Sequence, residues 1–170
     1  MNFIYNINYR HLLLFLLIAS ISALLGAYIS QYVFDLQPCI LCFYQRKPFF
    51  AVIILTILAL LFKSLANRQK LIIILAALIL LINAFIALYH VGVENKIFAG
   101  PANCSAANYS ITDIDKLKQI LEKTKAVRCD KPAFTFLNIS MAGWNVIYCL
   151  SLVIITFITL KIINNHDHNS

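Results

Sequence analysis

Long apolar runs separated by short polar links dominate the 170-residue chain. Four of these runs carry no charged residue, over lengths close to the roughly 17–25 residues that a transmembrane helix needs. They cover residues 12–29, 48–62, 71–89 and 142–160. The second is the shortest, and we extend it at its N-terminal boundary to give a span over about 45–62. The pattern predicts an all-α membrane protein, a four-transmembrane-helix bundle.

The composition favours one integral membrane domain over residues 1–170. Apolar residues make up 61% of the chain, against about 45–50% in soluble domains. The first run is longer than the roughly 7–15 residues of a signal-peptide core, and no small-residue cleavage site follows it, so we expect a retained helix. The net charge of +7 comes from loop lysines and does not indicate nucleic-acid binding.

Four spans place both termini on one side of the membrane and the loops 30–44 and 90–141 on the other. Cys39, Cys42, Cys104 and Cys129 therefore share one face. Basic residues are dense in the short link 63–70, but the opposite side carries more of them, so loop charge alone does not fix the orientation. Four thiols suit an oxidising compartment, which puts the cysteine loops outside the cytoplasm and the termini inside it.

The first cysteine pair lies in the stretch QPCILCFYQR, at the start of the second span. Pro48 suits the first turn of a helix, so Cys39 and Cys42 are expected at or just before the helix N-terminus. Partial positive charge there stabilises a thiolate. Arg46 follows Cys42 by four residues and can share its helix face, whereas Lys47 is expected only to anchor the span at the headgroups.

The second pair flanks a predicted amphipathic helix over residues 110–127, whose apolar face would lie on the bilayer or on the bundle itself. A Cys104–Cys129 disulfide would restrict the unfolded loop by roughly 3–4 kcal/mol, so it could be a structural staple. His90 ends the third span as an interfacial residue or a cofactor contact. Cys149 is expected to act as a small apolar side chain.

Two cysteine pairs on one membrane face indicate electron transfer by thiol–disulfide exchange. The sequence contains no haem, flavin or nucleotide motif. A quinone is the simplest electron acceptor to expect, because it is lipid-soluble and the reactive pair lies at the lipid boundary. Zinc held by four thiolates is the rival, but the spacing C-x2-C-x61-C-x24-C lacks a second close pair, and no metal is expected.

QPCILCFYQR, YHVGVE with GPANC, and RCDKPAFTFLNISMAGWN together resemble the quinone-dependent disulfide bond formation protein B (DsbB) family. The resemblance covers residues 37–145 and implies a bacterial inner-membrane oxidoreductase. Such an enzyme reoxidises a periplasmic thioredoxin-fold protein of the DsbA type and passes the electrons to ubiquinone or menaquinone.

The resemblance also implies residue roles. Cys104 and Cys129 would form the disulfide that oxidises the partner, and electrons would pass to a Cys39–Cys42 disulfide, whose Cys42 donates to the quinone. Arg46 would stabilise the Cys42 thiolate and the reduced quinone. His90 and Met141 match positions near the quinone.

Gln45 stands where some relatives carry an acid, and no proton-transfer role is assigned to it. Two alternatives remain open. The thiol–quinone relay could run in the reductive direction, as in the vitamin K epoxide reductase type, or the chain could be a disulfide-stapled membrane scaffold without catalysis.

Overall fold

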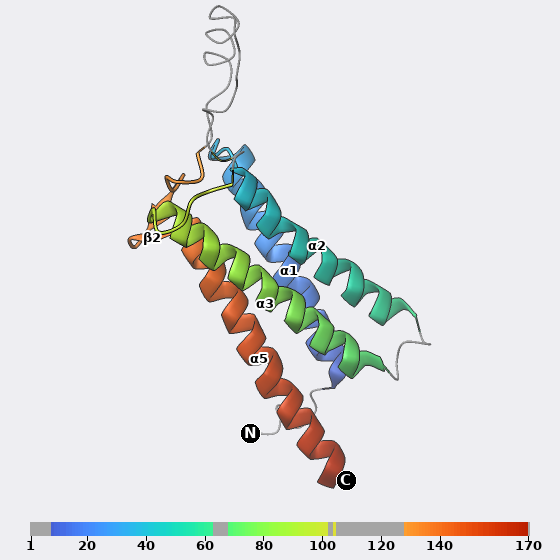
Figure 1. Ribbon diagram of the computed structural model, residues 1–170. Helices are drawn as coiled ribbons and strands as arrows, with labels where there is room; N and C mark the ends of the chain where they lie inside the picture. The colour runs from blue at the N-terminus through green and yellow to red at the C-terminus, as the bar shows by residue number, and fades with distance from the viewer. Residues whose placement is uncertain (1–7, 63–67, 102–103, 105–127, 170) are drawn as a thin grey trace, which may run out of the picture.

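The computed structural model describes residues 8–62, 68–101, 104 and 128–169. Four helices in this part of the chain form an up-and-down bundle (Figure 1). They are α1 (Tyr9–Tyr32), α2 (Ile40–Leu61), α3 (Gln69–Glu94) and α5 (Met141–Asn169). All four are long and apolar enough to cross a membrane, which confirms the predicted all-α membrane fold. The helix expected over 110–127 lies outside the described residues.

The helix boundaries differ from the apolar runs in one informative place. α2 begins at Ile40, so Pro48 lies inside the helix and the expectation that it occupies the first turn is wrong. Proline is tolerated within transmembrane helices because neighbouring groups compensate for the backbone hydrogen bond that it removes. The early start gives α2 two further turns of helix, and these carry Cys42 and Arg46.

α3 is the central element, because it packs against both α2 and α5, while α1 packs mainly against α2. Its buried face is rich in alanine, at Ala76, Ala77, Ala84 and Ala87. Small side chains allow helix backbones to approach closely in a membrane, where burial of apolar surface gives little driving force between helices.

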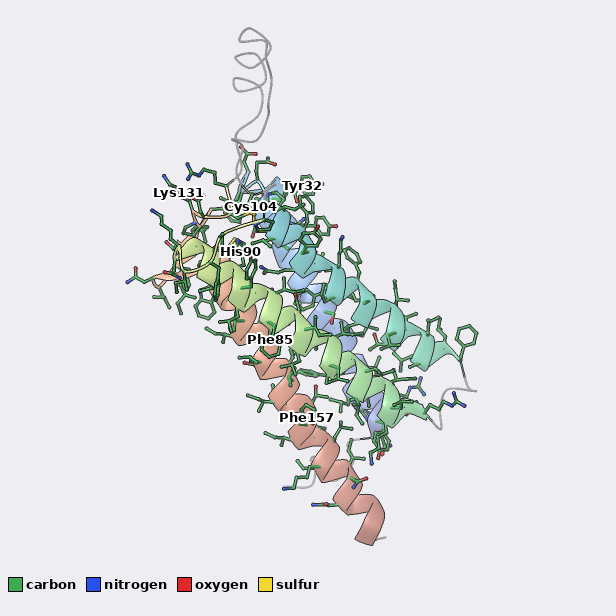
Figure 2. All side chains as sticks on the ribbon, in the orientation of Figure 1. Tyr32, Phe85, His90, Cys104, Lys131 and Phe157 are labelled. Atoms are coloured by element: carbon green, nitrogen blue, oxygen red, sulfur yellow. A yellow bond between two sulfur atoms is a disulfide. The ribbon has the colours of Figure 1, made fainter. Side chains whose placement is uncertain are left out.

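The outward faces of the helices carry large apolar side chains such as Phe85 and Phe157 (Figure 2). Two buried hydroxyl groups are satisfied within their own helix, since those of Thr56 and Thr156 each donate to a carbonyl oxygen one turn earlier. Among the described residues, the Ser20 Oγ, Asn83 Oδ1 and Glu94 Oε2 atoms are buried without a hydrogen-bond partner. An apolar exterior and a backbone hydrogen-bonded within helices are what a hydrocarbon solvent requires.

A short hairpin precedes α5. Its strands β1 (Thr135–Phe136) and β2 (Ile139–Ser140) pair antiparallel. The two turn residues, Leu137 and Asn138, both have positive φ, as the tightest hairpin turns require. The indole Nε1 of Trp144 in α5 donates to the carbonyl oxygen of Phe136, which holds the hairpin against the first turn of that helix.

We call the end of the bundle where α1 and α3 finish and α2 and α5 begin the cysteine end. Figure 2 shows Tyr32, His90 and Cys104 together there. Cys39 and Cys129 belong to the same buried cluster as Cys104, so the structure brings both cysteine pairs to one end of the bundle.

Candidate functional site

The first cysteine pair lies at the N-terminus of α2. Cys39 is the N-cap residue and Cys42 is in the first turn, which confirms the position expected from the sequence. Their Sγ atoms are 3.0 Å apart, with both thiols free. The Cys39 Sγ also accepts a hydrogen bond from the backbone N–H of Cys42. The cap position therefore directs both a thiol and a backbone amide at one sulfur atom.

His90 adds a third group to that sulfur. The last turns of α3 place its Nε2 atom 3.5 Å from the Cys39 Sγ, and the imidazole is 3% exposed. The pKa of Cys39 is lowered to about 4, and the hydrogen bond with the Cys42 side chain is the largest cause. His90 acts in the same direction, while burial opposes both. Hydrogen bonds to the ionised form account for this direction.

The sequence resemblance gives the thiolate to Cys42, whereas these hydrogen bonds converge on Cys39. Two adjacent thiols ionise as a coupled pair, so the first proton lost belongs to the pair. In the reduced state, these contacts favour Cys39 as the site of the negative charge. This state is distinct from the one in which Cys39 is bonded to another sulfur and Cys42 alone ionises.

The second pair is joined. Cys104 and Cys129 form a disulfide, with their Cα atoms 5.3 Å apart. Both residues are buried, and they form one apolar cluster with Cys39, Leu41 and Val93. The cluster brings the disulfide next to the first pair, as a direct exchange of sulfur–sulfur bonds requires.

A pocket of about 570 Å³ opens on the other side of Cys42. α1, α2 and α5 enclose it, and Cys42, Arg46 and Met141 line it. Its walls are mainly apolar, with Phe49 and Trp144 among the lining side chains. The structure thus brings together the thiol, the arginine and the methionine that the sequence singled out. His90 does not line the pocket; it contacts the Cys39 side of the pair.

Arg46 is half-buried and held by α1. Its guanidinium group donates to the Gln31 side chain at 2.7 Å and to the Ala27 carbonyl oxygen at 3.3 Å. It also stands 5.0 Å from the centre of the Tyr28 ring. These contacts fix a permanent positive charge at the pocket wall. The ammonium group of Lys47 instead lies over the exposed Tyr44 ring, as expected for a boundary residue.

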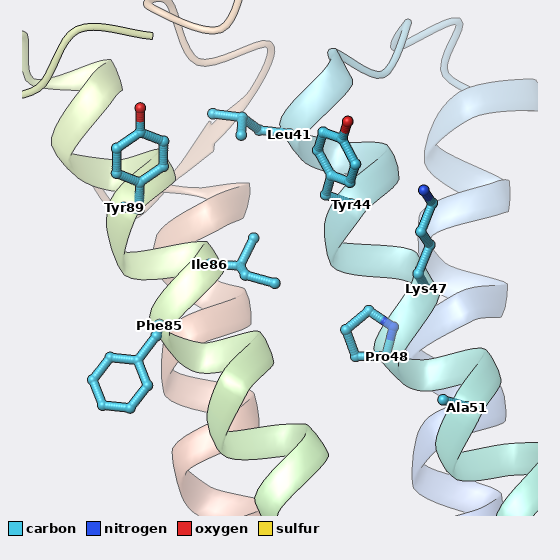
Figure 3. Close-up of a pocket in the computed structure, with 8 residues that line it drawn as sticks. All are labelled: Leu41, Tyr44, Lys47, Pro48, Ala51, Phe85, Ile86 and Tyr89. Carbon is cyan, nitrogen blue, oxygen red and sulfur yellow. The ribbon is translucent and has the colours of Figure 1, made fainter. Parts of the chain in front are cut away.

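A second groove of about 620 Å³ runs between α2 and α3 (Figure 3). Leu41, Ile86 and Phe85 line it, and no cysteine does. Its polar groups are the hydroxyls of Tyr44 and Tyr89 and the amine of Lys47. This groove suits a lipid chain, whereas the pocket beside Cys42 combines an apolar wall with a redox group.

A line of buried polar side chains lies behind His90, and it was not predicted from the sequence. The Nδ1 atom of His90 is 2.8 Å from the Gln45 amide, which in turn meets the Asn145 amide at 2.8 Å. Asn145 contacts Cys149, whose thiol is hydrogen-bonded and does not act as a plain apolar side chain. The spacing of Asn145 and Cys149 on one helix face is the only local signal for this arrangement; the other contacts join different helices.

Cys39, Cys42 and His90 are also a candidate metal-binding group, with their ligand atoms within 4.8 Å of one another. Two thiolates bound tetrahedrally at about 2.3 Å from zinc lie about 3.8 Å apart. The observed 3.0 Å between the sulfur atoms fits a hydrogen-bonded thiol pair better. The four-thiolate alternative does not fit either, because Cys104 and Cys129 are joined to each other.

Comparison with known proteins identifies the family. The family model described as Disulfide bond formation protein DsbB matches residues 9–159. Uncharacterized protein RP370 of Rickettsia prowazekii is 35% identical over 155 residues, covering 90% of this chain and 88% of the relative. Disulfide bond formation protein B of Blochmanniella floridana is 25% identical over 150 residues, covering 85% of this chain and 84% of the relative. No solved structure matches the chain. The chain therefore belongs to the DsbB family of multi-pass membrane proteins that generate disulfide bonds.

Proposed function

We propose that this protein reoxidises a periplasmic dithiol protein of the DsbA type and passes the electrons through its two cysteine pairs to a membrane quinone. The observation that carries the proposal is the shared pocket: Cys42 and Arg46 line one mainly apolar space between α1, α2 and α5. Ubiquinone and menaquinone are the two acceptors that we consider. The family relationship supports the oxidising direction over the reductive one.

The pocket suits a quinone ring in size and chemistry. Its volume of about 570 Å³ falls within the roughly 300–1,000 Å³ of small-molecule sites, which are apolar with a few placed polar groups. A bound quinone supplies a two-electron acceptor. The Cys42 thiol would face the ring, and the charge of Arg46 would stabilise an anionic Cys42 sulfur beside it. Met141 would contribute an adaptable apolar contact.

The cluster of three cysteines supports a specific order of exchange. The partner's thiolate attacks Cys104, which releases the Cys129 thiolate. Cys129 then attacks Cys39 of the oxidised first pair, and Cys42 leaves as a thiolate next to the pocket. The partner's second thiolate completes its own disulfide and releases Cys104. Cys104 attacks Cys129, restores the second disulfide, and releases Cys39, so both electrons now rest on the first pair.

The approach of the partner favours Cys104 as the attacked atom. Cys104 lines a pocket of about 390 Å³ together with Gly100 and Asp130, whereas Cys129 does not line it. Both sulfur atoms are otherwise buried. We place the cysteine end in the periplasm, the termini in the cytoplasm and the bundle in the bacterial inner membrane, as a single domain.

Stopped-flow mixing of the purified protein with a reduced DsbA-type partner and ubiquinone tests the proposal. We expect quinone absorbance to fall in proportion to partner oxidised, with one quinone consumed for each disulfide formed. Repeating the titration with menaquinone identifies the preferred acceptor. If neither quinone is reduced in the presence of the dithiol partner, the electron-transfer proposal fails and the scaffold alternative gains support.

A further inference from the structure

The buried polar side chains behind His90 form a continuous line across three helices. Starting inside the bundle, it runs from Asn83 of α3 to Cys149 and Asn145 of α5, then to Gln45 of α2 and back to His90 of α3. The successive separations are 3.4, 3.5, 2.8 and 2.8 Å. All but Asn145 are buried, and Asn145 is half-buried.

Each hydrogen bond in this line has one possible direction. The Nδ2 atom of Asn83 donates to the Cys149 Sγ, which leaves the Cys149 thiol hydrogen for the Oδ1 atom of Asn145. The Nδ2 atom of Asn145 donates to the Gln45 Oε1. The Gln45 Nε2 must then donate to the Nδ1 atom of His90, because an amide nitrogen has no acceptor capacity.

The direction of the line decides the tautomer of His90. An Nδ1 atom that accepts a hydrogen bond carries no proton, so in the neutral imidazole the proton is on Nε2. The Nε2 atom faces the Cys39 Sγ at 3.5 Å and the Glu94 carboxylate at 3.8 Å. The shorter contact, and the one within hydrogen-bonding range for sulfur, is to Cys39.

We propose that Gln45, Asn145 and Cys149 are positioning residues that hold His90 in the tautomer with its proton on Nε2, so that this proton is presented to the Cys39 sulfur. To reverse the tautomer, both amides would have to turn over together and the Cys149 thiol would lose its acceptor. A buried polar group without a partner is costly, so the line behaves as one unit.

The consequence for electron transfer rests on the proposed function. When Cys104 attacks Cys129 of the Cys39–Cys129 bridge, the bond from Cys129 to Cys39 breaks and Cys39 leaves with the electron pair. The Nε2–H group of His90 donates a hydrogen bond to this anionic sulfur, and the proton stays on His90. The opposite tautomer would direct a lone pair at the leaving sulfur and slow the step.

The test reads the tautomer directly, by ¹⁵N NMR of His90 in the full-length reduced protein in detergent, with His90→Gln to assign the signals. The wild type is expected to show a protonated Nε2 and an unprotonated Nδ1. Gln45→Met removes the donor while keeping the volume, and we expect it to mix the two tautomers. Cys149→Ala breaks the line farther away and is expected to do the same more weakly, while Cys149→Ser keeps donor and acceptor and restores the wild-type spectrum.

The second readout is the ionisation of Cys39, followed by thiolate absorbance in a Cys104→Ser/Cys129→Ser background. Among the residues that the structure describes, the titratable groups near Cys39 are Cys42, His90 and, behind His90, Glu94. The charge of Arg46 lies by the pocket. Gln45→Met should raise the midpoint of Cys39 ionisation by about one pH unit. At a pH below the midpoint, this shift corresponds to a tenfold smaller thiolate fraction. Thr56→Val, which removes a buried α2 hydroxyl outside the line, is the control and should change neither readout.

A proton on Nδ1 in the wild type would overturn the inference, as would an unchanged tautomer and midpoint in Gln45→Met. A Cys149→Ser spectrum that matches Cys149→Ala would show that packing and not hydrogen bonding is responsible, and would also overturn it. The failure of the proposed function looks different: quinone reduction would be absent in the wild type while the tautomer readout stayed as expected.

Discussion

The two cysteine pairs meet in one cluster but are held in different ways. Cys39 and Cys42 are three residues apart, fixed by the first turn of α2, and surrounded by hydrogen-bonding groups. Cys104 and Cys129 lie outside the four helices, are 25 residues apart and are joined by a disulfide. They share an apolar cluster with Leu41 of α2 and Val93 of α3. Neighbouring side chains set the ionisation of the first pair, whereas the disulfide bond itself holds the second pair together.

This difference indicates a division of labour. Hydrogen bonds to Cys39 stabilise a negative charge, which suits the proposed role of this pair in passing electrons to a quinone. A disulfide between segments outside the helices can be reached and exchanged by a second protein, and its partner contacts need not disturb the bundle. The first pair should therefore respond strongly to single polar substitutions and the second mainly to loss of a sulfur atom.

The largest expected effect separates the two pairs by function. Cys42→Ser should lower steady-state quinone reduction by a factor on the order of 10³ or more, because it removes the proposed electron donor at the pocket. It should still oxidise one equivalent of partner through Cys104 and Cys129. Cys104→Ser should show the reverse: no oxidation of the partner, but continued quinone reduction driven by a small dithiol that reaches Cys39 and Cys42 directly. Stopped-flow absorbance with quantitative thiol trapping measures both activities.

Circular dichroism and detergent gel filtration serve as the control that both variants stay folded. Equal loss of partner oxidation and dithiol-driven quinone reduction in the two variants would contradict the division of labour.

The next effect concerns the charge at the pocket. Arg46→Met should raise the KM for quinone about tenfold. The loss of one charge-assisted interaction costs roughly 1.4 kcal/mol of binding free energy, which corresponds to that factor. Lys47→Met is the matched control one residue away, because its ammonium group lies over Tyr44 and lines the other groove. A quinone titration that gives the same KM for wild type and Arg46→Met would return Arg46 to a purely anchoring role against Gln31.

A moderate effect is expected when the pH is lowered, because the Cys39 thiolate of the reduced protein becomes protonated. The pKa of Cys39 is lowered from 9.0 to about 4, so the reduced protein should carry one thiolate at every pH between these values. The associated stability is fully present above the ordinary thiol pKa and is lost as the pH falls through about 4. Thiolate absorbance of the reduced protein during acid titration measures this, and Cys39→Ser should remove the acidic transition. A single transition near the ordinary thiol value would contradict the hydrogen-bond account.

The sequence was sufficient for the features that are encoded locally. Uncharged apolar runs fix the four helices, and the helix start fixes the neighbourhood of Cys39 and Cys42. Pro48 shows where a local rule fails, since its restriction to the first turn comes from helices in water and the bundle accommodates it inside α2. The hairpin at Leu137 and Asn138 was also missed, because a leucine with positive φ is not a recognisable turn signal.

The remaining site features depend on contacts between helices, which no linear pattern carries. Arg46 was expected to face Cys42, and it does line the same pocket, but its bonds to Gln31 and Ala27 depend on the way α1 packs on α2. From the sequence, Gln45 was notable only because some relatives carry an acidic residue at this position. Its place between His90 and Asn145 follows from the packing of α2, α3 and α5 around one buried point.

The smallest expected effect belongs to the arginine beside the second pair. Arg128 precedes Cys129 as an exposed side chain and pairs with Asp130, 2.5 Å from its Oδ2 atom. This pairing lowers the pKa of Asp130 to about 2, but an exposed ion pair contributes little to stability because water and salt screen it. Arg128→Gln should therefore leave the thermal midpoint and the rate of quinone reduction unchanged within error, in contrast to Arg46→Met. Differential scanning fluorimetry and the stopped-flow assay provide the measurements, and a tenfold loss of partner oxidation in this variant would show that the second pair, too, is tuned by its charged neighbours.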